Sequence, residues 1–454
     1  MNRRGMTLVE MLVAMTATLL IMAAVAQAFS AFGNAISGGR SVLEIDARMR
    51  SAAWRLRSDL AGATARPVPP LNPAAGEGYL EIIEGPATDN LDSSLASTTG
   101  LAVSGDHDDV LLLTTRSLDT PFIGRAPGTS SAIDDTFEST LAEVGWFARP
   151  TPGTSNPVTY TLYRKQLLVM GYVGTDPFTT ARGNTLPWST NGGSWSGYFN
   201  SPCDVSARLE LTASGTTLFP NTLADLTRRE CRFLHNPLGL TGTAAFPSVF
   251  AAGNHQSPTA ADGLIFDTTQ RQGEDVVLTN VLAFDVRVFD PAAPVFVTGT
   301  GSALVPGDPG FVNTPVASGA YVDLGHAVTS NSLLPGLAPR FAGFGLTRSG
   351  LAASAATRRT YDTWSLGYEA DGLDHDNDGT IDDGTNGLDD DGDGSFDEPP
   401  YDGDGDGVFE DPGEVETLPP YPSPLRGVEV RIRCYEASSK QVRQVTVRHT
   451  FVPL

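Results

Sequence analysis

The chain has 454 residues, of which 40% are hydrophobic and 18% are charged, so it contains enough apolar residues for a large folded core. The formal net charge of −23 argues against a nucleic-acid partner, because a negative surface repels phosphates. The acidity is local: 19 of the 53 acidic residues lie in residues 371–416, which contain no Lys or Arg, and such a segment is expected to attract cations.

A long apolar segment lies near the N-terminus. Between Met6 and Phe32 the only charged side chain is Glu10, and a helix of this length spans about 40 Å, enough to cross a bilayer. Arg3 and Arg4 precede it, which predicts a single span with a cytoplasmic N-terminus and the rest of the chain outside. A secretory signal peptide fits less well, since its apolar core is shorter and a small-residue cleavage site follows it.

Glu10 argues against a plain membrane anchor. A carboxylate inside an apolar span costs roughly 2.5–3.5 kcal/mol on insertion scales, so a plain anchor has no reason to keep it. The segment from Gly5 to Glu10, GMTLVE, resembles the processing site of type IV prepilins: a short basic leader ends in Gly, and the fifth mature residue is an acid. The family usually has Phe as its first mature residue, where this chain has Met6, which is also apolar.

The prepilin resemblance implies roles for three residues. A prepilin peptidase would cleave between Gly5 and Met6 and methylate the new Met6 amine. Glu10 would pair with the Met6 amine of a neighbouring subunit during assembly, so that two charges that are costly in lipid compensate each other.

The helix is expected to continue beyond the membrane through residues 33–66. No proline occurs before Pro67, and Gly38-Gly39 is a possible kink. This part of the helix carries an apolar stripe, which we expect to pack on a sheet. Four arginines lie mostly on other faces of the helix: Arg48, Arg50, Arg55 and Arg57. An independent amphipathic helix on the membrane surface is the alternative. The stripe, at three- or four-residue spacing, consists of Val42, Ile45, Met49, Ala52, Leu56 and Leu60.

After Pro67 the sequence changes to short strand patterns separated by long loops. The last two patterns predict an antiparallel hairpin across residues 436–440, whereas Gly174–Gly197 and Pro291–Ser354 are interpreted as surface loops. The predicted strands are Tyr79–Ile83, Val110–Thr115, Glu143–Phe147, Val158–Met170, Val276–Phe289, Gly427–Tyr435 and Gln444–Val452.

These patterns predict an α+β fold, in which a long N-terminal transmembrane and amphipathic helix packs on an antiparallel β-sheet head. The predicted parts are a leader (1–5), a transmembrane helix (6–32), its amphipathic continuation (33–66), a periplasmic β-rich head (67–370), an acidic insert (371–416) and a C-terminal β-hairpin of the head (417–454).

Four internal phrases are similar to the minor pilin and pseudopilin group represented by type II secretion protein J and PilW. They are Ala53–Leu60, Tyr160–Arg164, Asn280–Val286 and the closing segment Gly427–Phe451. The resemblance implies a structural subunit of a type IV pilus or type II secretion pseudopilus in the bacterial inner membrane, at the tip or in assembly priming. Its partners would be other pilin-like subunits, the prepilin peptidase, the inner-membrane assembly platform and membrane lipid.

The acidic insert repeats one pattern three times, with acids at positions 1, 3, 5 and 9, Gly at position 6 and an apolar residue at position 8. This is the oxygen spacing of an EF-hand-type calcium loop. The ligand positions are Asp374, Asp376, Asp378, Thr380 and Asp382 in the first loop, Asp389, Asp391, Asp393, Ser395 and Asp397 in the second, and Asp402, Asp404, Asp406, Val408 and Glu410 in the third.

The calcium-loop match is incomplete, because position 12 is Thr385, Pro400 or Gly413 instead of Glu. The repeats therefore resemble the short aspartate-rich calcium repeats of extracellular proteins, with Ca²⁺ affinity on the order of 10⁻⁴–10⁻³ M. A solvated acidic linker is the alternative, but a random run of charge would not repeat the Gly and the apolar residue in register. Without calcium, repulsion among the carboxylates should disorder the insert.

The remaining reactive side chains give weaker signals. Cys203 and Cys231 fit either a disulfide or two buried thiols, whereas the alternating pattern around Cys434 predicts a core thiol. His107, inside an Asp-His-Asp-Asp run, suits a metal site, but a polar loop is favoured. The sequence shows no nucleophile or metalloprotease motif, so we expect a structural subunit and not an enzyme; a membrane-anchored calcium-dependent adhesin is the alternative function.

Overall fold

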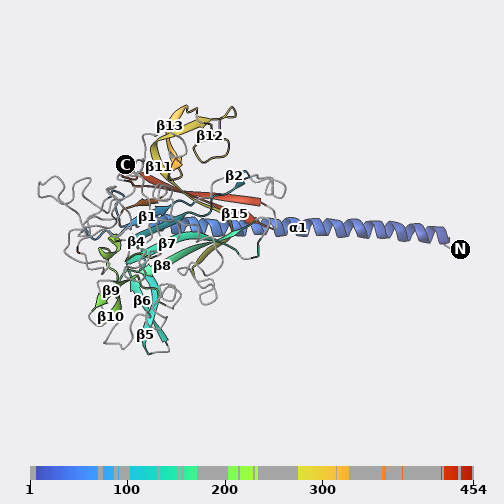
Figure 1. The fold of residues 1–454 in the computed structure, drawn as a ribbon. Coiled ribbons are helices and arrows are strands. Elements are labelled where there is room, and N and C mark those ends of the chain that lie inside the picture. Colours follow the sequence, from blue (N-terminus) through green and yellow to red (C-terminus); the bar gives the residue numbers. More distant parts are fainter. Residues whose placement is uncertain are drawn as a thin grey trace.

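The computed structural model of the chain combines one long helix with a large antiparallel sheet (Figure 1). It describes residues 7–69, 75–85, 90–91, 103–130, 133–151, 153–154, 158–170, 203–212, 215–228, 231–233, 275–312, 314–326, 360–363, 381, 421, 424–437 and 441–451. The predicted leader, the predicted loop Gly174–Gly197 and nearly all of the acidic insert lie outside these residues.

Helix α1 (Leu8–Ala61) has 54 residues and continues through Gly38-Gly39, where the sequence suggested a kink. Its N-terminal part projects away from the head as a rod, and its C-terminal part lies within the head (Figure 1). The helix ends at Gly62, whose N–H donates to the carbonyls of Ser58 and Leu60. The chain then joins the sheet, since Arg116 N donates to Gly62 O at 2.7 Å.

The main sheet has ten strands in the order β14-β1-β4-β7-β8-β11-β15-β16, with β12 and β13 also paired to β11. All of these pairs are antiparallel. The strands are β1 (Leu80–Ile83), β4 (Val110–Arg116), β7 (Leu141–Pro150), β8 (Tyr160–Leu168), β11 (Val276–Val297), β12 (Ala303–Leu304), β13 (Ala317–Val322), β14 (Thr360–Asp362), β15 (Gly427–Glu436) and β16 (Gln441–Thr450).

Three two-stranded ribbons accompany the main sheet. They are β2 (Asn90–Leu91) with β3 (Val103–Ser104), β5 (Phe122–Ser130) with β6 (Ile133–Ser139), and β9 (Ala207–Thr212) with β10 (Gly215–Pro220). A single 3₁₀ turn, η4 (Asp225–Thr227), follows β10.

Strand β11 differs most from the prediction. The sequence placed a loop from Pro291 onward, but β11 continues past Pro291 and Pro294 and pairs with β13. The pairing register shifts between Asp290 and Pro294, and a bulge of this kind accommodates prolines that cannot donate to the ladder. Asp290 Oδ1 accepts a hydrogen bond from Ala292 N at 2.8 Å within the bulge.

The main core lies between α1 and one face of the sheet. Ile45, Met49, Ala52, Leu56 and Leu60 of the predicted stripe are buried there, whereas the four arginines are exposed, so the prediction of a helix packed on a sheet is confirmed. The predicted hairpin is also confirmed as β15 and β16, which both contact α1.

The opposite face of the sheet carries a second core. In β4, Leu111 and Leu113 belong to the core under α1, whereas Val110 and Leu112 belong to the second core, as the two-residue period of a strand requires. Residues from the β9–β10 ribbon and from the segments beside it complete the second core. The half of the sheet around β4 and β7 is therefore buried on both faces.

Candidate functional site

The N-terminal end of α1 is built by Thr7 and Glu10, which form a capping box. Glu10 N donates to Thr7 Oγ1 at 3.3 Å, and Thr7 N donates to Glu10 Oε2 at 2.9 Å. Thr7 Oγ1 also donates to Glu10 Oε2 at 3.0 Å. The negative carboxylate thus lies at the positive end of the helix dipole, where it is favoured, and both hydrogen bonds that it accepts from Thr7 go to Oε2.

The helix surface that follows Glu10 is apolar and lies outside the head. Residues Leu8–Gly33 form a segment of 26 residues with a mean hydropathy of 2.2, long and apolar enough to cross a membrane, and none of it is buried in the head. The hydroxyls within it are satisfied locally: Thr18 Oγ1 donates to Ala14 O at 2.7 Å, and Thr16 Oγ1 donates to Leu12 O at 3.0 Å. Glu10 is therefore the feature of this segment that lipid cannot accommodate by itself.

The other end of α1 is fixed to the sheet by Asp59. Its carboxylate accepts hydrogen bonds from Trp146 Nε1 at 2.8 Å, from Arg164 Nε at 2.8 Å and from Arg164 Nη2 at 2.7 Å. Thr115 Oγ1 donates to the Asp59 backbone carbonyl at 2.9 Å. The Asp59 side chain is 4% exposed and that of Arg164 is 12% exposed, so this is a buried, bidentate ion pair.

Asp59 and Arg164 belong to two of the internal phrases that carried the resemblance to minor pilins, Ala53–Leu60 and Tyr160–Arg164. The structure brings these phrases together, with the acid of the first bound by the base of the second. Between the membrane segment and this pair, α1 keeps one face free of the head. Leu43 and Trp54 are exposed on it, and eleven residues apart they lie on the same side of the helix.

The structure describes only some of the predicted site residues. Gly5, Met6 and the fifteen proposed calcium ligands lie outside the described residues, so their roles stay predictions. Cys434 is a buried free thiol, as predicted, and its burial raises its pKa to about 12. Cys203 and Cys231 are both buried, and the ring of His107 stacks on Tyr160 at 4.0 Å between centroids.

Two residues of this site were missed by the sequence analysis. Thr7 had a readable signal, because a Thr three residues before an acid at the start of an apolar run is typical of a capping box. Asp59 lies in a phrase that the sequence analysis quoted, but its pairing had no local signal, because Trp146 and Arg164 are remote in sequence.

The N-terminal segment matches a known family model. The model, described as the prokaryotic N-terminal methylation motif, covers residues 1–26. No curated protein and no solved structure matches the chain. The match confirms that the chain begins with a prepilin-type motif, as in type IV pilin-like and pseudopilin-like subunits. Such a motif implies processing by a prepilin peptidase and assembly with other pilin-like subunits.

Proposed function

We propose that this chain is a minor pilin or pseudopilin, similar to PilW or to type II secretion protein J, in a type IV pilus or a type II secretion pseudopilus. The observation that carries the proposal is the division of α1 into two halves. The first half is apolar, carries the methylation motif and is left exposed by the head, whereas the second half is built into the head. The protein acts as a structural subunit and not as an enzyme.

In this proposal, Glu10 provides the charge that selects a neighbouring subunit. Cleavage after Gly5 and methylation leave a charged Met6 amine, which is costly in lipid, as the Glu10 carboxylate is. Because the bonds to Thr7 use only Oε2, Oε1 remains for the amine of the adjacent subunit. Assembly then neutralises two buried charges at once, which favours a fixed axial offset between neighbouring helices.

The breadth of the head supports a position at the tip or in priming. Ribbon β5–β6 and strands β12 and β13 extend from opposite sides of the sheet, away from the axis of α1 (Figure 1). A head of this breadth packs poorly in a repeating shaft but has room at an end. Antibodies against the head should therefore label filament ends in electron micrographs, and labelling along the whole shaft would contradict a tip position.

The calcium part of the proposal concerns the three aspartate-rich loops in residues 374–410. Their repeated ligand pattern supports Ca²⁺ binding that orders the insert next to the terminal hairpin. Calcium should raise the Tm of the full chain, and the combined variant Asp378→Ala, Asp393→Ala and Asp406→Ala should lose most of this gain. A gain of the same size in the combined variant would count against the loops.

The decisive experiment for the membrane and assembly proposal has two readouts. Mass spectrometry of the mature chain should show N-methyl-Met6 at its N-terminus. Glu10→Gln should leave cleavage intact but abolish co-purification with other pilin-like subunits, whereas Glu44→Gln, on the same helix outside the membrane, should have no effect. An intact leader, or normal incorporation of Glu10→Gln, would refute the proposal. Binding of cells or glycans by a chain that never joins a filament would favour the adhesin instead.

A further inference from the structure

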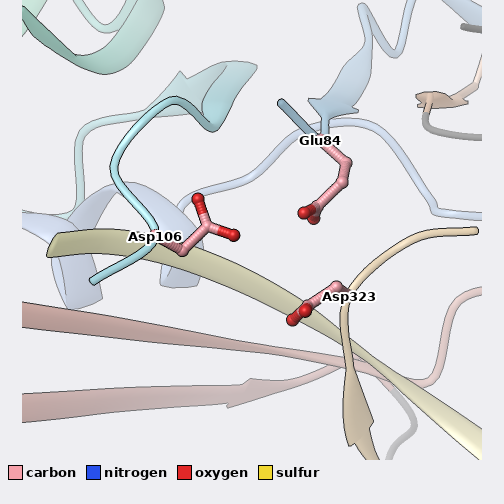
Figure 2. A group of neighbouring side chains, drawn as sticks. All are labelled: Glu84, Asp106 and Asp323. Atoms are coloured by element: carbon pink, nitrogen blue, oxygen red, sulfur yellow. The ribbon is translucent and has the colours of Figure 1, made fainter. Parts of the chain in front are cut away.

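Three carboxylates from distant parts of the chain converge inside the head. Glu84 follows β1, Asp106 lies in the loop before β4, and Asp323 follows β13, and their side chains point toward one another (Figure 2). Each offers an oxygen atom, and these atoms lie within 4.8 Å of one another. All three residues are buried, with 5%, 1% and 7% of their surfaces exposed.

The backbone holds this cluster together from several sides. Phe284 N of β11 donates to Asp106 O at 2.8 Å, which fixes the loop of residues 105–109 against the sheet. Asp109 accepts hydrogen bonds from Val286 N at 2.6 Å and from Gly85 N at 3.1 Å, so it ties β11 to the end of β1. The loop that the sequence analysis interpreted as polar is therefore a buried structural element.

Two glycines give the carboxylates their space. A Cβ atom on Gly307, which has φ +94°, would lie 2.3 Å from Asp323 Oδ2. A Cβ atom on Gly85 would lie 2.1 Å from the Asp108 carboxylate carbon. Any other residue at either position would push an acid out of place, so the close approach of chain and carboxylate depends on these two glycines.

One acid of the cluster, Asp323, pairs with a buried arginine whose charge is shared with other acids. Arg287 is shared by three acids, with Nε 3.0 Å from Asp285 Oδ2 and 3.0 Å from Asp323 Oδ1, and Nη1 2.9 Å from Asp308 Oδ1. Glu84 Oε2 is buried and has no hydrogen-bond donor among the described residues. A buried carboxylate oxygen aimed at two other carboxylates requires a proton or a cation.

We propose that Glu84, Asp106 and Asp323 bind a calcium ion that is separate from any bound by the acidic insert. The ligand set is oxygen only, which favours a hard divalent cation over zinc or copper. Oxygen atoms that share one Ca²⁺ ion lie at most about 5.2 Å apart, and the three oxygen atoms of the cluster, within 4.8 Å of one another, satisfy this limit. Mg²⁺ prefers to keep several waters, so a site this deeply buried suits Ca²⁺ better.

The pKa shifts of the cluster are consistent with this proposal. Burial, followed by repulsion from Asp109, raises the pKa of Glu84 and of Asp106 well above the ordinary range. A bound Ca²⁺ ion would compensate this repulsion and connect β1, the loop of residues 105–109 and the end of β13.

The test separates this site from the acidic insert. We would prepare the full chain in detergent with the insert inactivated by Asp378→Ala, Asp393→Ala and Asp406→Ala, and measure bound calcium by equilibrium dialysis with atomic emission. This background chain should still bind about one ion. Adding Glu84→Gln together with Asp323→Asn should weaken that binding by ~100-fold or more. In EDTA, Glu84→Gln alone should not lower the Tm, because it removes one of several buried carboxylates that repel one another.

A matched control is Glu143→Gln, which neutralises another fully buried acid. Glu143 accepts hydrogen bonds from Tyr79, Ser206 and Phe233 and lies outside the cluster, so this variant should keep the calcium response. A background chain without bound calcium, or a Glu84→Gln Asp323→Asn chain that retains it, would overturn the proposal. Equally tight binding of Mg²⁺ to the background chain would overturn the choice of Ca²⁺. If the insert variants by themselves abolish all calcium binding, the acidic insert binds the calcium and the cluster in the head does not.

Discussion

Replacing Asp59 by Ala removes the polar group that fixes α1 to the sheet. The substitution takes away both carboxylate oxygens and leaves the Arg164 guanidinium and the Trp146 indole N–H without their acceptor. Trp146 is completely buried, so water cannot replace the lost acceptor without opening the core. The change therefore tests whether the packing of the C-terminal half of α1 on the sheet requires this ion pair in addition to the apolar stripe.

The expected cost comes from the burial of the partners. Removing one member of a buried ion pair costs about 3–5 kcal/mol, because the remaining charge stays desolvated. The matched control is Glu44→Ala, which removes an acid from the same helix. Glu44 pairs with Arg48, and both side chains are more than half exposed, so its loss should cost below about 0.5 kcal/mol.

Guanidinium unfolding of the full chain in detergent, followed by near-ultraviolet circular dichroism, gives the free energy of unfolding for each variant. Arg164→Ala and the double variant complete a cycle, and we expect a coupling energy of about 2–3 kcal/mol between Asp59 and Arg164. The ion pair does not hold the helix in place if the free energies of unfolding of Asp59→Ala and Glu44→Ala differ by less than about 1 kcal/mol. The same conclusion follows if the effects of Asp59→Ala and Arg164→Ala on that free energy are additive.

Three further predictions follow from other buried groups. Leu56→Ala, under the sheet, should lower the free energy of unfolding by about 2–5 kcal/mol, whereas Leu43→Ala on the exposed face should change it little; equal effects in denaturant titrations would contradict the docked stripe. Burial raises the pKa of the Glu143 carboxyl above its value in the unfolded chain, about 4.3. The stability that the buried carboxyl contributes is therefore complete below that unfolded pKa and is lost as the pH rises through the higher folded pKa. Glu143→Gln should therefore reduce the fall in Tm between the unfolded and the folded pKa of Glu143. If Tm falls with pH as steeply in this variant as in the parent chain, the Glu143 carboxyl is not the cause of the fall. Because burial raises the pKa of Cys434 to about 12, iodoacetamide at neutral pH should modify Cys434 only after unfolding, and rapid labelling of the native chain in mass spectra would show an open core.

The sequence predicted the elements whose signals are local and periodic. The stripe from Ile45 to Leu60 and the alternation in β15 each identify a buried face within one segment, and the structure buries those faces, whereas in β16 only Val447 is buried. The two-faced burial of β4 was not readable in this way, because a run such as Val110–Leu113 is apolar at every position.

The sequence analysis failed where the outcome depends on distant residues or on exceptions to turn chemistry. Pro291 and Pro294 indicate a loop, and only the shifted pairing with β13 lets β11 continue past them. Ribbon β5–β6 was missed, since Gly124 and Pro127 interrupt the strand pattern of β5. Likewise, only Asp106 of the proposed calcium ligands in the head had a local signal, because Glu84 and Asp323 reach it through the folding of the sheet.

The contacts of α1 with β15 and β16 set an order on the biogenesis of the subunit. The first helix to enter the membrane rests on strands near the opposite end of the sequence, so its apolar stripe has no complete partner until those strands have been synthesised and paired. Such long-range closure is slow compared with local folding. A chain that lacks the hairpin would therefore leave part of this apolar stripe uncovered. Completion of the C-terminal hairpin is thus a condition for burying the whole stripe of α1.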